Sequence, residues 1–145
     1  IKAEKVKRPR PRRVLEMDQL KKICNVKVWL ILIAVIHTVV GVLAQTDFSV
    51  DAEAEMAGVF LVISTYLFYA AFFTTGEAQA RLAAVLAGPI WVWFMICALF
   101  ELESGTGFVW ELGPELLPPL VFWGMTALSG LLHGNFHNLM SSQEA

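Results

Sequence analysis

The chain has 145 residues, of which 57% are hydrophobic and 17% are charged, and its formal net charge is -2. About a quarter of the residues in a soluble domain are charged, so this composition argues against an ordinary soluble domain. The acidic net charge and clustered charges argue against a nucleic-acid-binding protein, and two cysteines, Cys24 and Cys97, are too few for a disulfide framework.

The basic residues are confined to the first part of the chain. All eleven Lys and Arg residues lie at or before Arg81, and ten of them precede the first long apolar run. The loops at 45–56 and 101–115 hold eight acidic residues and no basic one. Because translocated loops rarely keep Lys or Arg, we expect a multi-pass protein of a bacterial inner membrane or an organelle membrane. Both termini are then cytoplasmic, and the acidic loops lie on the other side.

Residues 1–22 form a basic cytoplasmic arm, which we expect to be extended or disordered up to about Arg13 because prolines alternate with arginines. Met17, Leu20 and Cys24 recur at spacings of three and four, which is typical of a short amphipathic helix on the membrane surface. The alternative is a solvated, positively charged tail that only sets the topology. Basic side chains near a membrane surface attract anionic lipid. The residues expected to contact lipid or a partner are Arg8, Arg10, Arg12, Arg13, Lys21 and Lys22.

Four apolar segments follow the arm, and each is long enough for a transmembrane helix: about 28–44, 57–75, 82–100 and 116–135. Gly88-Pro89 is expected to kink the third span, and the short connection at 76–81 suits an antiparallel hairpin. The predicted fold is an all-α membrane protein in which residues 23–136 form an antiparallel bundle of four transmembrane helices. Residues 137–145 form a short cytoplasmic tail.

Ionisable groups inside a bilayer are costly and are therefore candidates for function. The central parts of the four spans contain no Asp, Glu, Lys or Arg, which argues against an ion-coupled transporter. His37 lies near the middle of the first span, where it either binds a haem or pigment, or takes part in a proton path, or is a neutral structural histidine. We favour the structural histidine, with a hydroxyl of Ser64, Thr65 or Tyr69 as its partner.

His133 and His137 are four residues apart near the end of the fourth span, so they share one helix face. No third metal ligand is evident, and we expect both to bond lipid headgroups or backbone carbonyls rather than a metal. His37 and His133 differ in depth by about 10 Å at a rise of 1.5 Å per residue, which argues against a haem held between them. The acidic loops lack the spacing of a calcium-binding EF-hand loop.

Small residues at helix interfaces let membrane helices approach closely. We expect Ala34, Gly41, Gly130 and Gly134 to make such contacts. The leading hypothesis is a non-catalytic accessory or structural subunit of a larger membrane complex, with no predicted cofactor or metal, whose partners are the bilayer and other membrane subunits. One alternative is a redox or cofactor-binding subunit that uses His37 or the His133/His137 pair. Another is a small homo-oligomeric channel or transporter, with Tyr66, Tyr69, Thr126 and His37 along its path.

Overall fold

The computed structural model describes residues 19–103 and 109–137, and these residues are mostly helical. In chain order the elements are α2 (Val26–Ile36), the π-helix η1 (His37–Leu43), α3 (Asp51–Phe73), α4 (Gly76–Leu99) and α5 (Leu117–His133). The one β pairing in the described part of the chain is an isolated bridge between Glu103 and Val109. The predicted all-α fold is confirmed.

Three helical stretches are long and apolar enough to cross a membrane: Gln19–Leu43, Asp51–Phe73 and Gly76–Leu99. They fit the prediction of an integral membrane protein. The fourth helix, α5, has 17 residues, or about 26 Å at 1.5 Å per residue, against about 30 Å for a hydrocarbon core. α3 and α4 begin six residues before the spans predicted from hydrophobicity, because backbone hydrogen bonding continues into the polar flanks.

The start of α2 is set by Asn25. Residues 19–23 are helical, but Asn25 is extended, and its side chain accepts a hydrogen bond from the amide of Val28 at 3.2 Å. This N-cap supplies a partner for an amide that the first turn of a helix leaves unpaired. The preceding helical turn, which carries the exposed Lys21 and Lys22, is thereby separated from α2. The four arginines of the basic arm lie outside the described residues.

The second half of the first predicted span is a π-helix rather than an α-helix. In η1 the amides bond five residues back, as in the bond from the Ala44 amide to the Val39 carbonyl at 2.9 Å. The Thr38 hydroxyl donates to the Ala34 carbonyl at 2.6 Å and so gives that carbonyl a side-chain partner. π-helices are rare and occur frequently at functional sites, which directs attention to His37, the first residue of η1.

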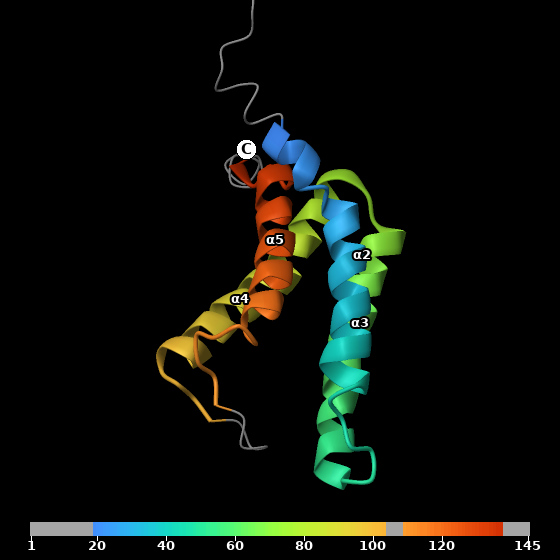
Figure 1. Ribbon diagram of the computed structural model, residues 1–145. Helices are drawn as coiled ribbons and strands as arrows, with labels where there is room; N and C mark the ends of the chain where they lie inside the picture. The colour runs from blue at the N-terminus through green and yellow to red at the C-terminus, as the bar shows by residue number, and fades with distance from the viewer. Residues whose placement is uncertain (1–18, 104–108, 138–145) are drawn as a thin grey trace, which may run out of the picture.

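The helices form two pairs that meet at one end. α4 and α5 share the most extensive contact, and α2 packs on both α3 and α5. Within the described residues η1 contacts α2 and α3, while α3 touches α4 sparsely and does not contact α5. Figure 1 shows the result: the α2–α3 pair and the α4–α5 pair are joined near the start of α2 and diverge toward the opposite end. His37 lies at the junction between α2 and η1.

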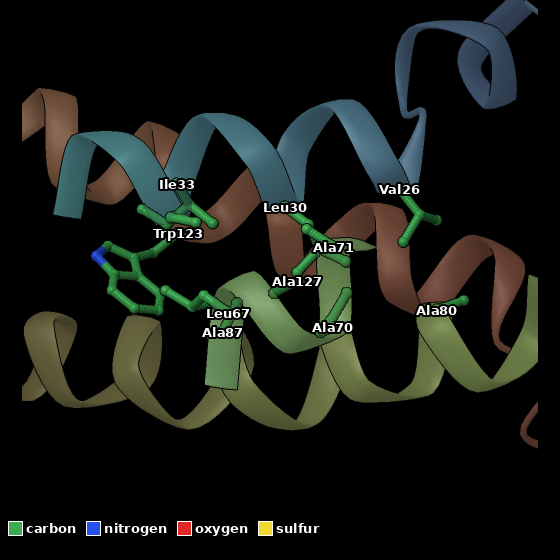
Figure 2. Close-up of a cluster of buried hydrophobic side chains, with 12 residues drawn as sticks. Val26, Leu30, Ile33, Leu67, Ala70, Ala71, Ala80, Ala87, Trp123 and Ala127 are labelled. Atoms are coloured by element: carbon green, nitrogen blue, oxygen red, sulfur yellow. The ribbon is translucent and has the colours of Figure 1, made fainter. Parts of the chain in front are cut away.

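The core lies where the pairs meet, and its side chains are mostly small (Figure 2). Its largest fully buried side chains are Leu30, Ile33 and Leu67. Burying large apolar side chains stabilises membrane helices little, because lipid tails are equally apolar. Close packing of small residues therefore stabilises the contacts between the helices instead. The remaining members of the cluster are Val26, Ala34, Ala70, Ala71, Ala80, Ala83, Ala87, Trp123 and Ala127.

Candidate functional site

His37 is held by a backbone carbonyl of the neighbouring helix. Its Nε2 lies 3.3 Å from the Phe60 carbonyl oxygen in α3. A carbonyl only accepts, so Nε2 carries the hydrogen and donates it. The expected hydroxyl partner is not the one used: the Ser64 hydroxyl donates to the same Phe60 carbonyl, also at 3.3 Å. An imidazolium is costly at this depth, so the ring is neutral and its Nδ1 is an acceptor.

Two aromatic rings contact the imidazole. The His37 ring meets Phe60 and Trp123 edge-on, with ring centroids 6.2 and 5.3 Å away. Trp123 in turn meets Phe94 of α4 edge-on at 6.3 Å, and Phe94 stacks on Trp110 at 5.1 Å. The rings therefore form a row that links α3, η1, α5 and α4 at the place where the two helix pairs begin to diverge.

His133 and His137 do not join His37. His133 Nδ1 lies 3.0 Å from the Ser129 carbonyl of its own helix, and His137 is exposed. The ring beside His37 is Trp123, which precedes His133 by ten residues, or about 15 Å along α5. One iron cannot bridge that separation. Among the described residues no three His, Cys, Asp or Glu side chains form a metal-binding group.

The four small residues expected at helix contacts have different surroundings. Ala34 is fully buried in the core. A Cβ at Gly130 would lie 2.4 Å from the Ala84 amide nitrogen and 2.5 Å from the Ala80 carbonyl oxygen, so α5 rests directly on the α4 backbone. Gly134 faces the Phe136 ring of its own segment, and Gly41 is exposed, with the His37 ring as its nearest neighbour.

A polar cluster joins the start of α4 to the end of α5. Arg81 Nε donates to the Gly134 carbonyl at 2.8 Å, and its guanidinium pairs with Glu77 at 2.8 Å. Asn135 follows α5 in the left-handed region, with φ of 46°, and donates to Glu77 at 3.1 Å. A cation at a helix C-terminus is favourable because the last carbonyls lack partners. Arg81 therefore fastens α5 to the α3–α4 turn.

Replacing Arg81 with Gln should lower the free energy of unfolding in detergent by about 2 kcal/mol, because the Gly134 carbonyl loses a charged donor. The matched control is Glu77→Gln, which removes the Arg81–Glu77 ion pair but keeps the hydrogen bond from Arg81 to the Gly134 carbonyl. Exposed ion pairs contribute about 0 to 1 kcal/mol, so the control should change stability by less than half as much. Equal losses in the two variants would show that the bond to α5 contributes nothing.

Two carboxylates at the acidic loop before α3, those of Asp47 and Glu53, accept hydrogen bonds from the loop itself. Ser49 donates to Asp47 through its amide at 2.9 Å and its hydroxyl at 2.6 Å, and these bonds hold the pKa of Asp47 below its usual value. Glu53 accepts from the Asp47 amide at 2.7 Å. Because both carboxylates bond the loop itself, they order the entry to α3.

The residues named for a channel path do not line one path within the chain. Tyr66 and Tyr69 are 57% and 53% exposed, and with Thr65, Leu82 and Leu86 they border an open groove of about 360 Å³ between α3 and α4. Thr126 is fully buried and donates to the Phe122 carbonyl at 2.7 Å.

Sequence reasoning missed the roles of Arg81, Gln79 and Trp123. Gln79 is 6% exposed, and its amide nitrogen donates to the carbonyls of Ala70, Ala71 and Thr74, which close the end of α3. A polar residue between alanines in the first turn of a span was the available signal for Gln79, and an isolated arginine beside a glutamate was the signal for Arg81. No protein-family model, curated protein or solved structure matches this chain.

Proposed function

We propose that this protein crosses the membrane four times and serves as a non-catalytic accessory subunit of a larger membrane complex. Both termini lie on the cytoplasmic side, and the two acidic loops lie on the other side. The absence of Lys and Arg from those loops supports this orientation. The length of α5, about 26 Å, is sufficient if flanking polar residues or local thinning of the bilayer cover the difference.

The proposal of a partner rests on one exposed face of α3. Gly58, Val62, Tyr66, Tyr69 and Phe73 recur at helical spacing and are all exposed; we call them the α3 stripe. Nothing in the described residues comes within 4 Å of a Cβ built on Gly58. A small residue left open in this way permits a second helix to approach closely, as Gly130 permits within the chain.

The tyrosines of the α3 stripe add a polar element. Neither phenol hydroxyl has a hydrogen-bond partner among residues 19–103 and 109–137. Lipid tails offer no partner for a hydroxyl, whereas a carbonyl or polar side chain on a neighbouring membrane helix does. The groove of about 360 Å³ beside Tyr66 and Tyr69 can receive an apolar side chain from that helix. Shape and hydrogen-bonding capacity thus favour another protein over lipid alone.

Photocrosslinking from native membranes tests this proposal. A photoreactive amino acid at Val62 should give a discrete adduct with another membrane protein, because Val62 lies in the α3 stripe. The same probe at Val85, which is 63% exposed on α4, serves as the control. Gly58→Leu should remove the adduct from position 62 and leave any adduct from position 85 unchanged. Adducts with lipid only, or an adduct at 62 that Gly58→Leu does not affect, would contradict the proposal.

A further inference from the structure

Two ring nitrogens, His37 Nδ1 and Trp123 Nε1, have no hydrogen-bond partner among the described residues. His37 Nδ1 is an acceptor, because Nε2 carries the hydrogen, and no described residue donates to it. Trp123 is 3% exposed, yet no described residue accepts from its indole Nε1–H. Every fully buried side-chain nitrogen or oxygen in the described part of the chain has a partner. Both of these nitrogens are therefore in contact with open space.

The chain leaves a route to His37 Nδ1. A Cβ on Gly41 would lie 3.4 Å from this nitrogen, and Gly41 itself is exposed. Gly41 follows His37 by four residues in η1, so a larger residue there would cover the imidazole. In Figure 2 the indole nitrogen of Trp123 points away from the rest of the core cluster. Neither nitrogen is thus closed off by the core.

The two nitrogens have opposite hydrogen-bonding roles, and the rings that carry them are in edge-on contact. The centroids of their rings are 5.3 Å apart. An unpaired acceptor and an unpaired donor in a membrane interior are each unfavourable, because hydrocarbon offers no partner. A hydroxyl group donates one hydrogen bond and accepts others, at typical distances of about 2.7 to 3.0 Å, so one hydroxyl has the capacity to pair with an acceptor and with a donor.

We propose that His37 Nδ1 and Trp123 Nε1 bind the hydroxyl group of a membrane-soluble small molecule. The apolar body of that molecule lies between the two diverging helix pairs, where Phe60 and Phe94 border it. Two sources of such a hydroxyl exist in membranes: a ring alcohol such as a quinol, and an aliphatic alcohol such as a diacylglycerol. The neighbouring rings of Phe60, Trp123 and Phe94 favour the planar ring, since offset and edge-on contacts stabilise ring pairs.

The test uses the whole chain, purified in a detergent that has no hydroxyl group, with ¹⁵N-labelled His and Trp. His37 and Trp123 resonances are identified by their loss in His37→Phe and Trp123→Phe. A decyl-substituted quinol and dioctanoylglycerol are titrated separately, and the dimethyl ether of the quinol serves as the ligand control. Saturable shifts of both His37 Nδ1 and Trp123 Nε1 are expected with one or both alcohols. The ether should produce neither shift.

Gly41→Val provides a variant that keeps both nitrogens. Its side chain should shield Nδ1 and weaken binding at least about tenfold, while Gly88→Val on α4, where nothing in the described residues lies within 4 Å of the Cβ, should change binding less than twofold. Far-UV circular dichroism checks that each variant is folded. Absence of a saturable shift with either alcohol would overturn the proposal, as would equal binding by Gly41→Val. A Soret band in the purified chain that disappears in His37→Phe would also overturn it, since the histidine would then bind haem.

Discussion

A single methyl group at position 130 is expected to destabilise the protein by about 3 kcal/mol. In Gly130→Ala the new Cβ would lie 2.4 Å from the Ala84 amide nitrogen, 2.5 Å from the Ala80 carbonyl oxygen and 2.9 Å from the Ala84 Cα. These are backbone atoms of α4 and cannot rotate away, so α5 must move outward. Overpacking of this kind typically costs about 1 to 3 kcal/mol, and the closeness of the contacts places this variant at the upper end.

Denaturation in a mild detergent, followed by circular dichroism, measures the effect. Gly58→Ala is the matched control because nothing in the described residues lies within 4 Å of its Cβ. Alanine is the better helix former by up to about 1 kcal/mol, so the control should be neutral or slightly more stable. Similar behaviour of the two alanine variants would mean that α5 does not rest on the α4 backbone.

Gln79→Leu should cost about 3 kcal/mol, because it removes a donor from several carbonyls at the end of α3. The amide nitrogen lies 2.9 Å from the Ala70 and Thr74 oxygens and 3.1 Å from the Ala71 oxygen. The Thr74 hydroxyl still donates to Ala70 at 2.7 Å, which leaves the other two carbonyls most affected. A buried acceptor left unpaired costs about 1 to 3 kcal/mol.

The matched control for this variant is Gln45→Leu, at an exposed glutamine in the first acidic loop. Its free energy of unfolding should stay within about 0.5 kcal/mol of the parent, as for most exposed substitutions. Hydrogen exchange adds a local measurement. The amides of the α3–α4 turn should exchange faster in Gln79→Leu, and unchanged exchange there would contradict a capping role for Gln79.

The fold was predictable because its main determinants are local. Continuous apolar runs predict helices long enough to span a membrane, and this signal does not depend on how the helices pack. The π-helix at His37–Leu43 was not predictable, since it depends on a one-residue shift of backbone hydrogen bonds with no distinctive composition. Helix starts were also missed at Asp51 and Gly76, because hydrophobicity marks the membrane boundary rather than the end of a helix.

The candidate site was predictable in part. His37 stands out as the ionisable residue deep in a span, but its partner is a backbone carbonyl, which the sequence cannot reveal. Nothing in the sequence distinguishes Trp123 from the other tryptophans, and only the fold brings its ring centroid to 5.3 Å from that of the imidazole. Gly41 and Gly130 are equivalent as sequence signals. Tertiary packing makes one of them a backbone contact and leaves the other exposed.

The proposed function requires that α5 cross the membrane, and cysteine labelling measures this directly. In a variant without Cys24 and Cys97, single cysteines are placed at the exposed positions Ser49, Thr75, Glu111 and His137. A membrane-impermeant maleimide applied to intact cells should label positions 49 and 111, and should label 75 and 137 only after permeabilisation. Labelling of 111 and 137 from the same side would contradict the four-span topology and, with it, the proposed orientation.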